Sequence, residues 1–105
     1  MRHLREVIIS VENDEVFIDP DVVTITRSKG ERVMWHCSQG AIEIQFKKDK
    51  EESPFTCHRF EAPQHGAVIS PVPKKKAEKG KLYKYTVIVT IGKDRFVKDP
   101  GVFVD

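Results

Sequence analysis

Hydrophobic and polar residues alternate with a period close to two along most of this chain. The clearest case runs from Ile42 to Lys47, where Ile42, Ile44 and Phe46 are separated by polar residues. Because successive side chains of a strand point to opposite faces, this pattern predicts a strand with one buried face. The same alternation occurs in residues 6–11, 23–26, 32–37 and 83–91. No segment carries a helical stripe of useful length, so we predict an all-β fold.

Turn-forming residues separate these segments. Gly30 and Gly40 lie in short polar stretches between two predicted strands, and Asp99-Pro100-Gly101 interrupts the last part of the chain. The region from Pro54 to Pro73 contains four prolines. Since proline cannot donate a ladder hydrogen bond, this region has room only for short strands, such as residues 67–70, within a long crossing.

Length and composition are those of one folded domain. The chain has 105 residues, of which 39% are hydrophobic and 32% are charged, and its formal net charge is +2. We predict a single domain over residues 1–105, a Greek-key β-sandwich of about seven to eight strands. The net charge is too small to indicate a nucleic-acid partner by itself. The sequence shows no signal-type apolar run and no membrane span, so we expect a soluble cytoplasmic protein.

Several segments resemble successive strands of a cupredoxin domain. Residues Phe17 to Trp35 contain a proline, an alternating strand, a glycine turn and a Val-x-Trp sequence. Ile42–Phe46 resembles the next strand, and Tyr83–Val87 resembles the Tyr-x-Tyr-x strand that leads to the copper loop. Ser53-Pro54-Phe55 and the ending from Asp99 to Asp105 are similar to small bacterial cupredoxin-like proteins. The resemblance covers nearly the whole chain and implies a Greek-key sandwich of the cupredoxin type.

The copper ligands of that family are not at the matching positions. The position of the first histidine ligand falls at about Ile42, and the position of the cysteine ligand falls at Val87. Residues 88–98 contain neither the second histidine nor the methionine. A blue-copper site needs two histidines and a cysteine with a weak axial ligand. We therefore expect no copper, no other cofactor and no electron transfer.

Two cysteines and two histidines could still form a different site. Cys57, His58 and His65 lie in the proline-rich region, and Cys37 could join them if that region folds over the end of the sandwich. Such a cluster could bind zinc or copper, Cys37 and Cys57 could form a disulfide, or Cys57 could be a reactive thiol. The simpler interpretation, which we favour, places Cys37 in the core and His36 on the opposite, wet face of its strand.

One lysine cluster and several aromatic residues are candidates for partner contact. Lys74, Lys75 and Lys76 could contact phosphate or an acidic surface, although a solvated loop is the favoured interpretation. Four phenylalanines have no clear inward partners in the strand pattern: Phe17, Phe55, Phe60 and Phe103. They could form an exposed patch, although aromatic side chains more often cap the open ends of a sandwich.

No catalytic motif accompanies these features, so we predict a non-enzymatic binding or protein-interaction module on a copper-free cupredoxin-like scaffold. The candidate partner-binding residues are Phe55, Phe60, Phe103, Lys74, Lys75 and Lys76. The alternatives are a metal or redox protein that uses the Cys/His set, and a binder of nucleic acid or an acidic partner through the lysine loop. The partner is an unidentified protein, and the outward apolar residues Ile8, Ile88 and Phe103 indicate either a further contact surface or a homodimer.

Overall fold

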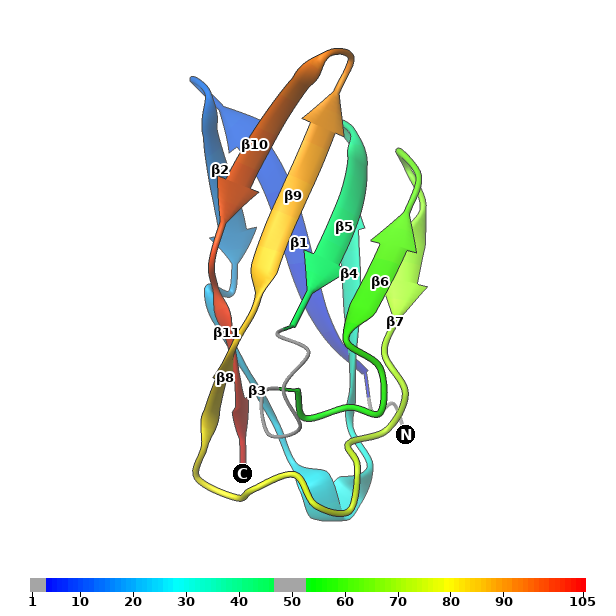
Figure 1. Cartoon of the computed structure of the whole chain (residues 1–105), viewed down its shortest axis with the longest axis vertical. Helices are drawn as coiled ribbons and strands as arrows, with labels where there is room; N and C mark the ends of the chain where they lie inside the picture. The colour runs from blue at the N-terminus through cyan, green and yellow to red at the C-terminus, as the bar shows by residue number, and fades with distance from the viewer. Residues whose placement is uncertain (1–3, 47–52) are drawn as a thin grey trace.

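A computed structural model describes residues 4–46 and 53–105, and these residues form an all-β, sandwich-like fold (Figure 1). The described residues contain eleven strands, arranged in three sheets, and no α-helix. The all-β prediction is therefore confirmed. The predicted number of seven to eight strands was too low, and the cupredoxin-type Greek key remains a prediction.

Sheet A covers one side of the core and has the strand order β2-β1-β4-β7. Its strands are β1 (Leu4–Glu12), β2 (Glu15–Asp19), β4 (Arg32–Cys37) and β7 (Ala67–Ile69). Strands β1 and β4 pair in parallel, and the other neighbours are antiparallel. In β4, Val33, Trp35 and Cys37 are buried while the residues between them face outward, as the alternation predicts.

Sheet C faces sheet A and has the order β10-β9-β5-β6, with antiparallel neighbours throughout. Its strands are β5 (Ala41–Gln45), β6 (Arg59–Ala62), β9 (Thr86–Ile91) and β10 (Asp94–Lys98). Strands β6 and β7 both come from the proline-rich region, which was expected to hold only short strands, and they have four and three residues. The predicted short strand at 67–70 corresponds to β7.

Sheet B continues the structure at one end of the sandwich, in the order β3-β11-β8. Its strands are β3 (Val22–Ile25), β8 (Leu82–Lys84) and β11 (Gly101–Val104). Each of these three strands is separated by one or two residues from a longer strand of sheet A or sheet C. A proline lies in two of these breaks: Pro20 between β2 and β3, and Pro100 between β10 and β11. Because proline has no backbone N–H, the ladder is interrupted there and the chain changes its neighbour. These breaks are one reason why the strand count exceeds the prediction.

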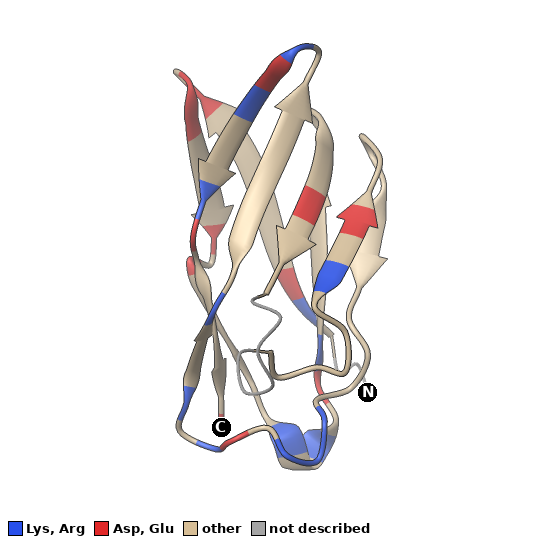
Figure 2. Cartoon of the chain, viewed as in Figure 1, with Lys and Arg blue, Asp and Glu red and all other residues tan. Residues whose placement is uncertain are grey.

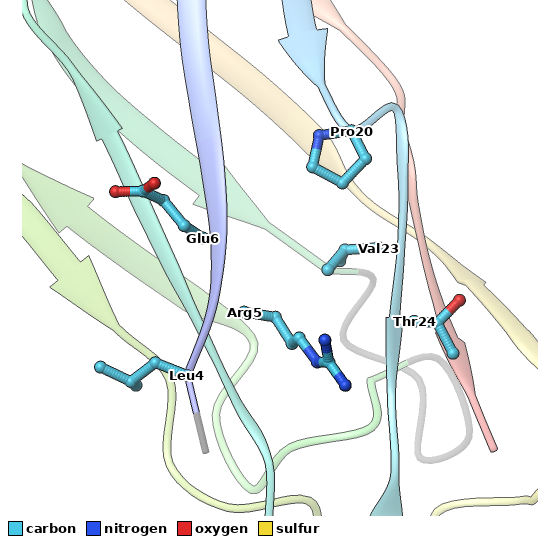
Figure 3. A pocket seen from close by; sticks show the side chains of 6 residues that line it. All are labelled: Leu4, Arg5, Glu6, Pro20, Val23 and Thr24. Carbon is cyan, nitrogen blue, oxygen red and sulfur yellow. The ribbon is translucent and has the colours of Figure 1, made fainter. Parts of the chain in front are cut away.

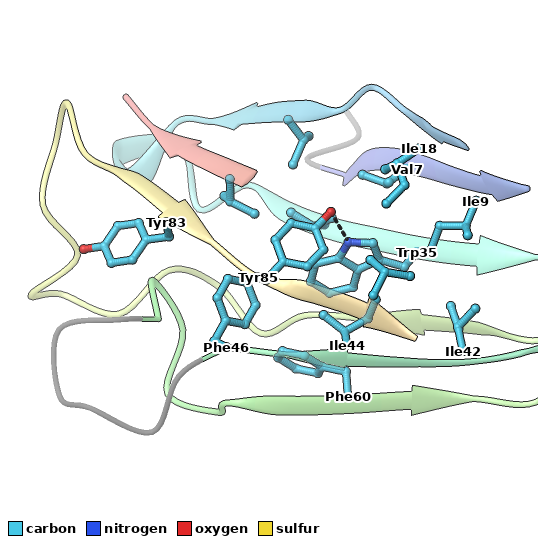
Figure 4. Packing of buried hydrophobic residues seen from close by; sticks show 14 of the residues in the cluster. Val7, Ile9, Ile18, Trp35, Ile42, Ile44, Phe46, Phe60, Tyr83 and Tyr85 are labelled. Atoms are coloured by element: carbon cyan, nitrogen blue, oxygen red, sulfur yellow. Dashed lines mark hydrogen bonds between the residues drawn. The ribbon is translucent and has the colours of Figure 1, made fainter. Parts of the chain in front are cut away.

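An aromatic cluster fills the centre of the core (Figure 4). The Trp35 ring centroid lies 5.4 Å from that of Phe60, and the Phe46 centroid lies 5.2 Å from that of Tyr85. The indole Nε1–H of Trp35 donates a buried hydrogen bond of 3.0 Å to the Tyr85 hydroxyl oxygen. Phe55 packs edge-on against Trp35, so the loop that follows the undescribed residues 47–52 seals this part of the core.

The prediction that Phe55 and Phe60 could bind a partner is corrected by their burial. Phe55 is 0% exposed and Phe60 is 8% exposed. Phe60 belongs to β6, whose inward positions meet the core, and Phe55 lies inside a turn in which the Ser53 hydroxyl accepts a hydrogen bond from the Phe55 amide. Both rings therefore belong to the core, and neither is an exposed partner-binding residue.

Candidate functional site

The cysteines and histidines do not converge. Cys37 is buried and Cys57 is exposed, and both are free thiols, so the disulfide is absent. The His65 amide donates a hydrogen bond of 3.2 Å to the Cys37 carbonyl oxygen, but this contact involves only the backbone. Within residues 4–46 and 53–105, no three His, Cys, Asp or Glu side chains lie together in a way that could hold a metal ion. The Cys/His cluster that includes His58 therefore does not form.

A depression of about 430 Å³ lies between β1 and β3 and is lined by Arg5, Pro20 and Thr24, among others. Figure 3 shows the Arg5 side chain on the β3 side of β1, whereas Leu4 and Glu6 point the other way. The Arg5 guanidinium is already engaged by Glu31 at 2.9 Å. The lining offers one hydroxyl, that of Thr24, and one carboxylate, that of Glu6, which Figure 3 shows on the far side of β1 from Thr24, so we assign no catalytic role to the depression.

The lysine loop, which we define as residues 74–81, is held in place at one end of the molecule. The Arg27 guanidinium, from the short 3₁₀ helix η1 (Arg27–Lys29), donates hydrogen bonds of 2.6 Å to the Ala77 carbonyl and 3.3 Å to the Lys75 carbonyl. The Lys74 amide donates to the Pro54 carbonyl at 2.8 Å, and the Ala77 side chain is fully buried. The loop backbone is therefore fixed against both η1 and the sandwich.

These contacts gather basic side chains from two distant parts of the sequence, η1 and residues 74–81. Figure 2 shows the basic residues of both segments at the lower end of the molecule, where the blue segments of η1 and of the loop lie next to each other. We call this group the basic end. It consists of Arg27, Lys29, Lys74, Lys75, Lys76, Lys79 and Lys81.

Acidic residues offset only part of this charge. Among the described residues, Glu31, Glu78 and Asp105 lie close to the basic end, and Glu31 is only 5% exposed. The Lys81 ammonium lies 3.7 Å from the Glu78 carboxylate and 4.8 Å from the centre of the Tyr83 ring. No ion pair within the described part of the chain involves Lys29, Lys75, Lys76 or Lys79, and all four side chains are exposed. These lysines remain available to an anionic partner.

Glu31 stabilises the turn from which Arg27 projects. Its carboxylate accepts a hydrogen bond of 2.6 Å from the Thr26 amide and pairs with Arg5 at 2.9 Å. Burial acts to raise the pKa of Glu31, but the Thr26 hydrogen bond and the Arg5 guanidinium outweigh it, so this pKa is lowered below its ordinary value. Glu31 is thus an ionised, structural residue, and it does not compete for a partner of the basic end.

An apolar strip on the outer face of sheet B lies beside the basic end. Leu82 on β8 is 44% exposed and lies opposite Phe103 on β11, which is half-buried. On its other side, Phe103 lies beside Thr24 of β3. Val22, 46% exposed, lies on the same face next to Gly101. The predicted partner residue Phe103 therefore lies near the lysine loop, which Leu82 follows directly.

Sequence reasoning missed Arg27, Lys29, Val22 and Leu82 as parts of this surface. Lys29 lies in the predicted turn at residues 28–31 and Arg27 directly precedes it. This position predicts exposure but says nothing about proximity to residues 74–81. The proximity depends on hydrogen bonds between segments about fifty residues apart.

Comparisons with known proteins assign no family. No protein-family model matches the chain, and no curated protein matches it significantly. In the described residues, no helix has both the length and the apolar character needed to cross a membrane. The function must therefore be argued from the surface itself.

Proposed function

We propose that this protein is a non-catalytic interaction module that binds an acidic segment of another protein through the basic end and the neighbouring apolar strip. The observation that carries the proposal is the gathering of η1 and the lysine loop into one cationic surface. A single run of lysines is usually a solvated loop, whereas basic residues that gather from separate segments on one surface indicate a binding surface.

A protein partner fits this surface better than a nucleic acid. Six of its seven cations are lysines, and the one arginine uses its guanidinium to hold the loop. Lysine acts as a hydrated point charge, without the bidentate geometry by which arginine reads phosphates and bases. None of the seven residues of the basic end is aromatic, Tyr83 is buried, and Phe103 in the neighbouring strip is only half-exposed, so base stacking has little support. The exposed strip of Val22, Leu82 and Phe103 instead suits apolar side chains within an acidic peptide.

We also propose that the binding surface is carried by a cupredoxin-like sandwich that binds no copper. Ile42 and Val87, at the positions of two copper ligands, are apolar and buried at 3% and 0% exposure. We expect that addition of Cu(II) to the protein produces no intense visible charge-transfer band. Such a band, lost on replacing Cys57 with serine, would instead support the metal-binding alternative.

The binding test compares two probes and two charge-reversed variants. A labelled oligoglutamate peptide with a few leucine replacements is titrated with protein by fluorescence anisotropy, and a single-stranded DNA oligonucleotide of similar charge is the second probe. We expect the peptide to bind with an affinity that falls as salt rises. Lys75→Glu/Lys76→Glu should weaken peptide binding by at least about tenfold, because attraction is replaced by repulsion.

The control variant is Lys93→Glu/Lys98→Glu, which makes the same change in net charge on exposed residues just before β10 and at its end. Figure 1 shows β10 far from η1. This variant should bind the peptide like the unmodified protein. Equal losses in both variants would show a response to net charge only and would contradict the proposed site. Tighter binding of the DNA would support the nucleic-acid alternative, and no binding of either probe would overturn the proposal.

A further inference from the structure

Strand β3 is an edge strand, and one side of its backbone has no partner in the described part of the chain. Sheet B has the order β3-β11-β8, so β11 covers only one side of β3. On that side, the Gly101 amide donates a hydrogen bond of 3.1 Å to the Asp21 carbonyl. Because the backbone groups of successive strand residues point to alternate sides, the N–H and C=O groups of Val22 and Thr24 point away from β11. Within residues 4–46 and 53–105, no hydrogen bond satisfies these four groups.

The next amide on the same side shows what this edge can bind. The Thr26 amide donates a hydrogen bond of 2.6 Å to the Glu31 carboxylate, which also pairs with the Arg5 guanidinium at 2.9 Å. The edge therefore already binds one carboxylate of the chain itself, held between a backbone N–H and a guanidinium. The Arg5 side chain is 52% exposed and carries five N–H donors, so it can bind a second carboxylate.

There is space beside this edge. The depression of about 430 Å³ lies between β1 and β3, and both Thr24 and Arg5 line it. Figure 3 shows the Arg5 side chain reaching from β1 toward β3. Strand β1 pairs with β2 only from Ile8 onward, and β3 pairs with β11 in another sheet. In the described residues, no strand therefore lies between the beginning of β1 and the free side of β3.

We infer that the acidic partner binds as an added β-strand along the free side of β3. This inference rests on the proposed function and specifies the form of the partner, an extended segment in which acidic and apolar residues alternate. Its backbone satisfies the free groups of Val22 and Thr24, as in other complexes formed by strand addition. Side chains of a strand alternate between its two faces. Inward carboxylates then meet Arg5, while outward apolar side chains lie beside Val22, which is 46% exposed.

The position of β3 connects this edge with the basic end. Strand β3 ends at Ile25, and η1 begins only two residues later at Arg27. A segment that follows β3 is thereby led to the lysines of η1 and of the neighbouring loop. One extended acidic segment can thus use the strand edge for its backbone and the basic end for its charge.

The first test asks whether backbone hydrogen bonds hold the peptide. A labelled peptide in which glutamate and leucine alternate is titrated with the unmodified protein by fluorescence anisotropy. Two further versions carry N-methyl groups on all leucine amides or on all glutamate amides, which removes those donors. Since only alternate amides of an added strand point to β3, one version should bind at least about tenfold more weakly and the other within about threefold of the parent peptide.

The outcomes of this test separate the inference from the proposed function. Equal effects of the two methylated versions, whether absent or large, would overturn strand addition. The proposed function would still stand if the parent peptide binds and Lys75→Glu/Lys76→Glu weakens its binding. A parent peptide that does not bind would overturn both.

The second test removes a donor from the protein. Thr24→Pro eliminates the free N–H without breaking a hydrogen bond to β11, and proline is tolerated on edge strands. Val97→Pro is the matched control, because β10 is an edge strand of sheet C and the Val97 amide points away from β9 in their hairpin. Thr24→Pro should bind the parent peptide at least about fivefold more weakly, whereas Val97→Pro should bind it like the unmodified protein. Thermal unfolding verifies that both variants fold, and equal peptide affinities of the two folded variants would overturn the inference.

Discussion

Replacement of Glu31 by glutamine tests how the basic end is built. Glu31 is 5% exposed, accepts a 2.6 Å hydrogen bond from the Thr26 amide and pairs with Arg5. Glutamine has nearly the same shape and can still accept the Thr26 hydrogen bond through its amide oxygen. Glu31→Gln therefore removes the charge while it retains most of the packing.

The size of the effect follows from the two contacts. A hydrogen bond to a charged group contributes about 1.5–3 kcal/mol to stability, and a neutral one contributes about 0.5–1.5 kcal/mol. The Arg5 side chain is 52% exposed, so solvent screening limits its ion pair to about 0–1 kcal/mol. We expect Glu31→Gln to lower the free energy of unfolding by about 1–2 kcal/mol at neutral pH. For a domain of this size, that corresponds to a fall in Tm of roughly 4–12 °C.

The pH dependence follows from the lowered pKa of Glu31. A carboxyl group whose pKa is lower in the folded state binds its proton more weakly there than in the unfolded chain. Its contribution to stability is complete above the ordinary value of 4.5 and disappears as the pH falls through the lower folded-state pKa. The stability difference between the unmodified protein and Glu31→Gln should therefore be largest near neutral pH and should shrink in acid.

The assay is urea unfolding followed by tryptophan fluorescence, since the single Trp35 lies in the core. The measurement is repeated from pH 7 down to the lowest pH at which both proteins remain folded. Glu61→Gln is the control, because Glu61 is 62% exposed and pairs with exposed Arg59, and it should change stability by less than about 0.5 kcal/mol. A Glu31→Gln deficit that stays the same in acid would refute the role of the charge, and no deficit at pH 7 would refute the role of both contacts.

Three further experiments test the buried Trp35–Tyr85 hydrogen bond, the placement of the two thiols and the close approach of Gly40 to β9. Tyr85→Phe leaves the buried Trp35 Nε1–H without its acceptor, and urea unfolding should show a loss of about 1–3 kcal/mol. Iodoacetamide should alkylate exposed Cys57 in the native protein, whereas buried Cys37 should react only after unfolding; equal rates measured by mass spectrometry would contradict this placement. Gly40→Ala adds a Cβ that overlaps a backbone carbonyl of β9, so thermal unfolding should reveal a loss of about 1–3 kcal/mol; an unchanged Tm would show that β9 can move away.

Strand faces were predictable because they depend on neighbours in the sequence. In β4 the alternation correctly assigned Trp35 and Cys37 to the core, and in β1 it assigned Ile8 to the outer face. Phe55 and Phe60 were harder, because the proline-rich region around them lacks a long alternating run. Their burial depends on how that region closes over Trp35, which is a long-range contact.

The sequence by itself determined that the described part of this protein is all-β and which side chains of its longer strands face the core. These properties are local, since a strand alternates its side chains whatever its partners are. The tertiary structure alone decided that η1 and the lysine loop share one end, that Phe103 and Leu82 form a strip beside it, and that Glu6 on β1 lies within 2.9 Å of His36 on β4. These groupings depend on pairing between strands distant in sequence, and one strand pattern is compatible with several such pairings.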